Sequence, residues 1–313
     1  MTLHDSVLVT GGGGFIGTWV LRELVSRGLR PVVFDLQRNS ERWEKVLGEE
    51  AAGVQFVAGS LLNRKLLDQT AREERVSHII HLAALLTPHC QQDPVAGCEI
   101  NVLGSVHLFE MARSLEGQIK GISYASSYAV YGPEADDATT GTTSGESGPP
   151  TFYGVYKLAV DHIAQQYWRH FGIASVGIRP HVVYGPERTM GLTAGPSLAC
   201  RAVAQGEPYA INYTGSVGYD YVEDVASAFV EAALNPPRGS TVVDLPSELA
   251  TTEEFAAAIN RVAPGASSLI SVSGPEIPRN IPPQPNYIAS LLPNWKATPL
   301  EEGIRRTIEF YKA

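Results

Sequence analysis

Residues 7–17 read VLVTGGGGFIG, and this stretch decides the fold. Val7, Leu8 and Val9 form a short branched apolar run that is typical of a buried strand. After the glycines, residues 18–27 (TWVLRELVSR) place apolar side chains near helical spacing. A strand, a glycine turn and a helix are the context that a phosphate-binding loop requires, because glycine lets backbone approach a pyrophosphate and a helix start offers free N–H groups.

The spacing of the glycines and the acid that follows them indicate the kind of nucleotide. Gly11, Gly14 and Gly17 give G-x-x-G-x-x-G, not the commoner G-x-G-x-x-G. The second apolar run ends at Asp35, where a carboxylate accepts hydrogen bonds from adenosine ribose hydroxyls and repels a 2′-phosphate. Arg38 would instead favour NADP, since it is placed to pair with that 2′-phosphate. The pattern therefore favours NAD over NADP. The simpler alternatives are that the glycines form an ordinary strand–helix corner and that Asp35 only caps the end of its strand.

Composition excludes several classes of protein. The 313 residues suffice for one large domain or two closely joined ones, and 44% hydrophobic content is ample for a core. No apolar run approaches the length of a membrane span, and no secretion signal is visible at the N-terminus. A net charge of -9 argues against general nucleic-acid binding. The cysteines, Cys90, Cys98 and Cys200, lack metal-site spacing, so we expect reduced thiols, no metal and a cytoplasmic protein.

Strand-like and helix-like runs alternate along the first 180 residues. Runs at 31–35, 54–57, 77–84, 119–125 and 174–178 predict further strands of an α/β, doubly wound parallel sheet. Beyond them we expect helices near 197–204, 222–234 and 252–262, a strand at 241–245 that returns to the large sheet, and a closing amphipathic helix. Residues 85–94 and 133–150 are predicted to be loops, the second a mobile flap.

Tyr153 and Lys157 carry the chemistry that the sequence indicates. Four residues apart on one helix, they lie on the same face. A tyrosine with an ordinary pKa near 10 is a poor base, but a neighbouring ammonium and a positively charged nicotinamide both favour the phenolate. Tyr153 is then able to exchange a proton with an alcohol or a ketone.

Further motifs follow in a fixed order. HLAA stands at 81–84, Asn101 at the next helix, VYG after Ser127, RP…YGP at 179–186 and W-x-x-x-P-L-E-E-G-I at 295–304. With the glycine loop and the tyrosine helix, they resemble the extended short-chain dehydrogenase/reductase family, also called the NAD-dependent epimerase/dehydratase family, over nearly the whole chain. The resemblance implies a Rossmann-type fold, NAD as cofactor and a homodimer packed through the helix of Tyr153.

The resemblance also implies roles for single residues. Ser127, Tyr153 and Lys157 would be catalytic, and the substrate would meet residues around them, namely Thr87, Ser127, Tyr128, Val182 and Arg188. The cofactor would contact the glycine loop, the strand ends and the tyrosine helix, at Gly11, Gly14, Phe15, Ile16, Gly17, Asp35, Ser60, Leu61, Leu82, Ala83, Ala84, Asn101, Tyr153, Lys157, Pro180 and Val183.

Two histidines and a cysteine near these motifs are predicted to be non-catalytic. His81 is interpreted as a packed structural residue, and His89 and Cys90 as parts of a surface loop. Ser60 replaces the family's usual Asp, so we expect a weaker contact with the adenine there.

Departures from the family pattern bear on the substrate. Tyr128 and Ala129 replace the acid pair of sugar-nucleotide dehydratases, which argues against dehydration. Val182 and Val217 stand where members that handle nucleotide sugars carry Asn and Arg. These changes favour a smaller substrate such as a free sugar, a sugar acid or another polyol. Arg188 is either the holder of an anionic group or an exposed loop residue, and Arg201 and Arg279 are further cations for such a group.

The sequence therefore predicts an NAD-dependent oxidoreductase acting on a hydroxyl or keto carbon of a sugar-like small substrate, with Tyr153 as acid and base. The alternatives are a UDP-sugar 4-epimerase with transiently reduced NAD, and a non-catalytic NAD-binding regulator. We expect residues 1–180 to form the NAD-binding domain, to which 220–245 returns. Residues 181–219 and 246–313 are predicted to form a smaller substrate-binding part.

Overall fold

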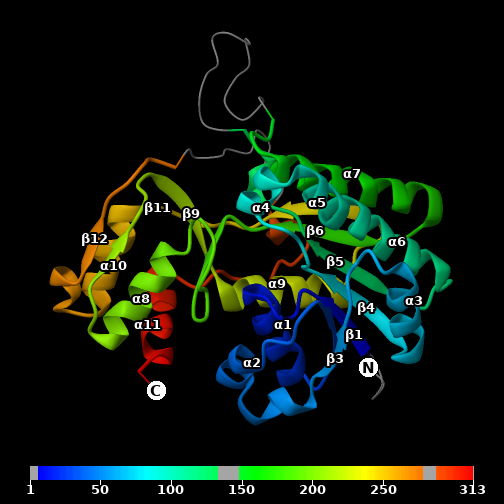
Figure 1. Cartoon of the computed structure of the whole chain (residues 1–313), viewed down its shortest axis with the longest axis horizontal. Coiled ribbons are helices and arrows are strands. Elements are labelled where there is room, and N and C mark those ends of the chain that lie inside the picture. Colours follow the sequence, from blue (N-terminus) through cyan, green and yellow to red (C-terminus); the bar gives the residue numbers. More distant parts are fainter. Residues whose placement is uncertain (1–5, 133–147, 278–286, 313) are drawn as a thin grey trace, which may run out of the picture.

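A seven-stranded parallel sheet forms the larger part of the protein (Figure 1). The computed structural model describes residues 6–132, 148–277 and 287–312. The strand order is β10-β6-β5-β4-β1-β2-β3, so the order reverses between β1 and β4, where ligands bind in doubly wound sheets. The strands are β1 (Ser6–Thr10), β2 (Arg30–Asp35), β3 (Gln55–Ala58), β4 (Val76–His81), β5 (Gly121–Ala125), β6 (Ser175–Arg179) and β10 (Ser240–Asp244).

Helices cover both faces of this sheet. Val7 and Val9 of β1 point into one core and Leu8 into another, as the period of a strand demands. The first core is closed by α1 (Phe15–Ser26), α2 (Ser40–Leu47) and α9 (Val222–Leu234), and the second by α3 (Arg64–Glu73), α6 (Gly104–Ser114) and α7 (Phe152–Phe171). The doubly wound fold that the sequence predicts is confirmed.

A smaller part lies beside the large sheet, on the left in Figure 1. Its three-stranded sheet has the order β11-β9-β7, and β8 pairs with β12. The strands are β7 (Val182–Tyr184), β8 (Tyr209–Ile211), β9 (Ser216–Tyr221), β11 (Glu248–Thr251) and β12 (Ile270–Val272), and the helices are α8 (Gly195–Gln205), α10 (Thr252–Val262) and α11 (Leu300–Phe310).

The chain crosses between the two parts more than once. After β9 it returns through α9 and then β10, which pairs in parallel with β6. The remaining short elements are η1 (Gly48–Gly53), α4 (Thr87–Gln92), α5 (Pro94–Cys98), the π-helical η2 (Glu99–Leu103), η3 (Tyr128–Val130), η4 (Ala266–Ser268) and η5 (Ile288–Ser290). Within the described residues, no helix is both long and apolar enough to span a lipid bilayer.

One loop predicted from the sequence is wrong. Residues 85–94 contain α4, and Cys90 on this helix is fully buried, whereas His89 is exposed. Pro88 at the start of the helix suits its first turn, and the Cys90 thiol packs beside Gly97 and Tyr156. The predicted flap at 133–150 falls mostly outside the described residues.

Candidate active site

The glycine loop lies at the start of α1, which begins at Phe15 and Ile16. Gly11 has φ +74°, a conformation that favours glycine, and a Cβ there would stand 2.7 Å from the Ala83 nitrogen. A Cβ on Gly17 would stand 2.2 Å from the Gly11 carbonyl oxygen. Gly14 precedes the helix, and no described side chain caps its first turn. The first N–H groups of α1 are therefore available to a pyrophosphate, which is what NAD requires.

Asp35 lies at the end of β2, beside this loop. Its Oδ2 accepts a hydrogen bond from the Gly13 amide at 3.0 Å, and its Oδ1 accepts one from the Leu36 amide at 2.7 Å. A carboxylate has about four lone-pair sites, so acceptor capacity remains for ribose hydroxyls. Arg38 donates to the Ala51 carbonyl at 3.1 Å and lies over the Trp43 ring.

Arg42, which sequence reasoning missed, is the cation that contacts the glycine loop. Its Nη1 donates to the Gly13 carbonyl at 2.9 Å, and Nη2 to the Thr189 hydroxyl at 3.3 Å. The hint in the sequence is its place in the first turn of α2, after the Asn39 cap.

The ribose position leads to a prediction. Asp35→Ala should weaken NAD binding by about 10- to 100-fold, the worth of hydrogen bonds to a charged group. It should also narrow the preference for NAD over NADP, because the repelling charge is lost while Arg42 stays. Fluorescence titrations with NADH and NADPH measure both effects. The control is the double variant Asp35→Ala/Arg42→Ala, which should lose the improvement in NADPH binding. If the wild type binds NADP more tightly than NAD, the role given to Asp35 is wrong.

The segment after β4 passes directly over the glycine loop. The Leu82 amide donates to the Thr10 carbonyl at 3.1 Å, and the Ala83 amide to the Thr10 hydroxyl at 3.3 Å. The small side chains of Ala83 and Ala84 let this segment pack closely on the glycine loop, where Ala83 contacts Gly11.

His81 is structural. Its ring bonds to the hydroxyls of Thr10 at 2.7 Å and Ser105 at 3.0 Å. Burial, with the nearby positive charge of Lys157, lowers the pKa of His81 to about 3, so the ring is neutral.

Asn101 fixes the segment after β4. Its Oδ1 accepts from the Leu85 amide at 2.7 Å, and its Nδ2 donates to the Leu85 carbonyl at 2.9 Å. Its Nδ2 also lies 3.4 Å from Cys90 Sγ, so this buried side chain holds Leu85 and α4 together.

The predicted adenine contacts differ in exposure. Ser60 is partly exposed, and its hydroxyl accepts from the Leu62 amide at 3.2 Å. Leu61 is 4% exposed and packs on Gly104 of α6. Of the two, Ser60 is the residue with a polar atom near the surface.

Tyr153, Ser127 and Lys157 come together at the carboxyl end of β5. Thr151 caps α7 by accepting from the Gly154 amide at 3.1 Å, so the helix starts with Tyr153 in its first turn. The Ser127 hydroxyl lies near the Tyr153 phenol and favours its ionised form. Lys157 donates from Nζ to the Ala125 carbonyl at 2.6 Å, and Nζ lies 5.5 Å from the centroid of the Tyr153 ring.

Burial dominates the electrostatics of this trio. It raises the pKa of Tyr153 to about 12, and the interaction with Ser127 opposes the rise. It lowers the pKa of Lys157 to about 8, against the charges of Asp161 and Cys90. The ammonium is thus near the phenol but bonded elsewhere, so the protein by itself does not produce a phenolate at neutral pH. A positive nicotinamide charge is needed to favour one.

The predicted substrate residues differ in exposure. Thr87 begins α4 and is partly buried, and the Pro180 carbonyl accepts from the Tyr128 amide at 3.2 Å. Tyr128 is buried and donates to the Leu245 carbonyl at 3.4 Å. Val182 and Val217 are core residues, 6% and 1% exposed.

Arg188 is not the exposed loop residue that the sequence allowed. Its guanidinium donates to the Val183 carbonyl and, at 2.7 Å, to the Thr193 hydroxyl. Burial lowers the pKa of Arg188 to about 10, which leaves it charged at neutral pH. Arg201 lies over the Tyr311 ring, and Arg279 is outside the described residues.

His181 is a second residue that the sequence did not single out. Its ring packs on that of Tyr128, with the centroids 4.8 Å apart. Its backbone amide donates to Asp220 at 2.7 Å, and burial raises the pKa of Asp220 to about 7. The position between Pro180 and Val182 in the RP…YGP motif was the available signal.

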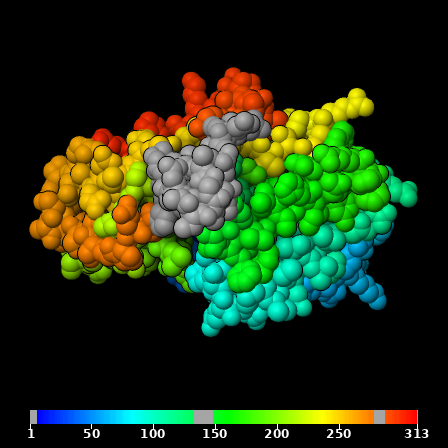
Figure 2. Space-filling view, turned by 90° about the horizontal axis from the view of Figure 1, so that it is seen from above, coloured from blue at the N-terminus to red at the C-terminus, as the bar shows by residue number. Residues whose placement is uncertain are grey.

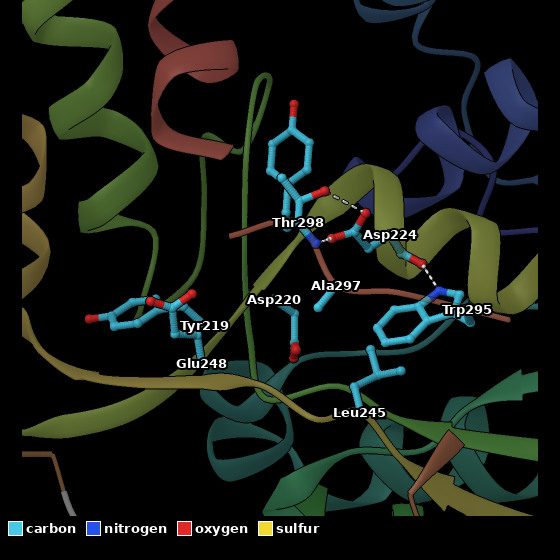
Figure 3. A pocket seen from close by; sticks show the side chains of 9 residues that line it. Tyr219, Asp220, Asp224, Leu245, Glu248, Trp295, Ala297 and Thr298 are labelled. Atoms are coloured by element: carbon cyan, nitrogen blue, oxygen red, sulfur yellow. Dashed lines mark hydrogen bonds between the residues drawn. The ribbon is translucent and has the colours of Figure 1, made fainter. Parts of the chain in front are cut away.

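A small polar pocket lies between β9, the start of α9 and the segment 295–298 (Figure 3). Its cavity of about 10 Å³ is near the volume that one water needs. Asp224 accepts from the Thr298 amide at 2.6 Å and hydroxyl at 2.8 Å, as Figure 3 shows. This carboxylate therefore anchors the C-terminal segment.

Comparisons with known proteins agree with this geometry. The family model described as "NAD dependent epimerase/dehydratase family" matches residues 7–244. The chain is 30% identical to UDP-glucose 4-epimerase of Mycolicibacterium smegmatis over 97% of this chain and 98% of that one. It is 25% identical to the probable UDP-glucuronate 4-epimerase of Rhizobium meliloti, over 97% and 96%.

A solved structure has the same architecture and contains the cofactor. The UDP-glucose 4-epimerase of Thermus thermophilus, in complex with NAD, superimposes with a TM-score of 0.77 at 26% identity, covering 98% of each chain. The glycine loop, the free start of α1 and the carboxylate of Asp35 are suited to the same cofactor. The chain is an enzyme that uses NAD, and it belongs to the NAD dependent epimerase/dehydratase family.

Proposed function

We propose that the protein oxidises or reduces a hydroxyl-bearing carbon of a sugar-like small substrate, with Tyr153 as the acid and base. The observation that carries the proposal is the meeting of Tyr153, Ser127 and Lys157 at the carboxyl end of β5. The same end of the sheet carries the glycine loop, so substrate and cofactor would meet there.

Each residue of the trio has a chemical task. Tyr153 takes the hydroxyl proton of the substrate, and in reduction it returns a proton to the carbonyl oxygen. Ser127 donates a hydrogen bond to the reacting oxygen. Lys157 stabilises the phenolate and binds the nicotinamide ribose. NAD, when bound, supplies the acceptor for the hydride that leaves the carbon.

The side chains at three positions favour a substrate without a nucleotide. A buried diphosphate needs cationic or hydrogen-bonding partners. The Val182 and Val217 side chains have none to offer, and Arg188 already bonds to Val183 and Thr193. We infer that residues 181–219 and 246–313 bind a free sugar, a sugar acid or another polyol, while 1–180 with 220–245 holds NAD.

The second candidate is a UDP-sugar 4-epimerase, and the relatives named above favour it. The two functions differ in what accumulates, because a dehydrogenase releases NADH and an epimerase reoxidises it within one turnover. A panel of free sugars, uronic acids and UDP-sugars with NAD, followed at the NADH absorbance, tests the first. Calorimetric titration with UDP tests the second: binding that is micromolar or tighter would reject the small-substrate proposal.

A homodimer through α7 is part of the proposal. The outer face of α7 and its neighbours exposes apolar side chains, Phe152 (45%), Val155 (46%), Val95 (69%) and Leu103 (43%). In Figure 2, α7 (green) and the cyan residues near α5 lie beside each other on the surface. Such an apolar face is suited to a second copy of the chain. A cytoplasmic location remains a prediction from the sequence.

Val155→Asp tests the dimer. It places a charge within this apolar face, and a charge buried without a partner in an interface is costly, so we expect the measured mass to fall by half. Light scattering after size exclusion measures the mass. Leu249→Asp is the control, because Leu249 is also exposed (54%) but lies on β11. A monomeric wild type would contradict the proposed interface.

A further inference from the structure

The inner face of α7 carries a third polar side chain, one turn beyond Lys157. Tyr153, Lys157 and Asp161 are spaced four residues apart and so project from the same side of the helix. Asp161 is 2% exposed. Its Oδ2 accepts from Ser126 Oγ at 2.9 Å and from Arg179 at 2.6 Å (Nη2) and 3.2 Å (Nε).

Ser126 lies between Ala125, whose carbonyl contacts Lys157, and Ser127, which belongs to the trio. The carbonyl of Ala125 accepts from Lys157 at 2.6 Å, and the hydroxyl of Ser127 lies near Tyr153 and favours its ionised form. Asp161 therefore holds the middle residue of the strip that positions both. Arg179 reaches the same strip, since its Nε also lies 3.4 Å from Ser126 Oγ.

The charge of Asp161 also acts on Lys157. Within the described residues, Lys157 forms no ion pair with a carboxylate, and Asp161 is the acid that favours its charged form. The other groups near Lys157 are Tyr153 on α7, Cys90 on α4 and the neutral His81 on β4. Tyr124 on β5 and Arg179 on β6 face Asp161 itself.

We propose that Asp161 is a positioning residue of the Tyr153–Ser127–Lys157 site: through Ser126 it fixes the Ala125 carbonyl and the Ser127 side chain, and its carboxylate keeps Lys157 charged. This inference rests on the proposed function of that trio. The simpler alternative is that Asp161 only neutralises Arg179, as a structural ion pair.

Asp244 offers a matched control for that alternative. It is the second carboxylate beside the same guanidinium, 4.0 Å from Arg179 Nη1, and it accepts from the Tyr131 hydroxyl at 2.9 Å. Arg179 Nη1 also donates to this hydroxyl at 2.5 Å. Asp244→Asn removes one negative charge from the surroundings of Arg179, as Asp161→Asn does, but it leaves the bond between Asp161 and Ser126 in place.

Three variants separate the two contributions. Asp161→Asn removes the charge while its amide oxygen can still accept from Ser126. Without this charge the pKa of Lys157 falls. Because Lys157 stabilises the phenolate only while it is charged, the pH at which kcat declines on the alkaline side should fall by about one unit. Ser126→Ala removes the bond and keeps the charge. It should lower kcat by about 10- to 100-fold with an unchanged alkaline limb, as expected for misplaced groups. Asp244→Asn should retain the wild-type profile.

A second measurement does not depend on turnover. The chain has six lysines, so ¹³Cε-lysine labelling resolves the titration of Lys157 by NMR, with Lys157→Met as the assignment control. A lower pKa of Lys157 in Asp161→Asn alone supports the proposal, even if no sugar is turned over and the proposed function fails. Equal titration curves in Asp161→Asn, Asp244→Asn and the wild type, with Ser126→Ala at full kcat, would overturn it. If Asp161→Asn does not fold, Ser126→Ala alone decides: full kcat would again overturn it.

Discussion

Tyr153→Phe is expected to lower kcat by at least about 100-fold, the usual contribution of a positioned acid or base. The phenyl ring of the variant fills the same space at the start of α7, so the helix and the cofactor site should persist. Only the phenol hydroxyl, which lies near Ser127, is lost. Steady-state kinetics with the substrate found in the panel, together with calorimetric NAD binding, measure the two quantities. NAD binding should change little.

Tyr156→Phe is the matched control for this experiment. Tyr156 lies on the same helix, three residues on, but its hydroxyl donates to the Pro94 carbonyl at 2.8 Å. The variant therefore loses a phenol hydroxyl, and its hydrogen bond, outside the trio. We expect it to keep nearly full kcat. Near-normal turnover of Tyr153→Phe would remove Tyr153 from the mechanism.

Gly17→Ala is expected to weaken NAD binding by about 10- to 100-fold, the equivalent of an overpacking cost of about 1–3 kcal/mol. The added Cβ would stand 2.2 Å from the Gly11 carbonyl oxygen and 2.7 Å from the Gly12 Cα. Both are backbone atoms and cannot rotate away, so the loop must move from the start of α1. The cofactor then loses the amide groups that this helix start presents.

Gly53→Ala is the control for the loop. A Cβ on Gly53 has nothing within 4 Å, so the substitution adds a methyl group in open space. Calorimetric titration with NAD compares the variants, and thermal unfolding checks that each is folded. Wild-type affinity in Gly17→Ala would show that the loop tolerates the methyl group and that the contact is not decisive.

Much of the fold follows from local pattern. The strand of residues 6–10, the glycines and the first helix are neighbours in the chain, so their side-chain periods report the structure directly. The same holds for Tyr153 and Lys157, because the helical repeat alone puts them on one face. The order of motifs then indicates the family, and with it the sheet, the cofactor and Ser127.

Contacts between distant segments lie beyond such patterns. Arg42 reaches Gly13 because α2 folds back over the loop, whereas Arg38, closer to Asp35 in sequence, turns to Ala51. Residues 85–94 contain too few periodic apolar positions to reveal α4, and the burial of Cys90 depends on packing near Gly97 and Tyr156. In the sequence Arg188 looks like a loop cation, and only the structure shows that it bonds to Val183 and Thr193.

The sequence by itself thus determined the doubly wound sheet and the use of NAD, and it predicted the trio, because these depend on periodicity and on residue types at short spacing. Only the tertiary structure decided what surrounds them: that burial, more than the ammonium of Lys157, sets the pKa of Tyr153, and that Asp161, Ser126 and Arg179 meet behind the trio. The physical reason is that desolvation and charge interactions depend on distances between elements, and the packing of α7 on β5 and β6 sets those distances.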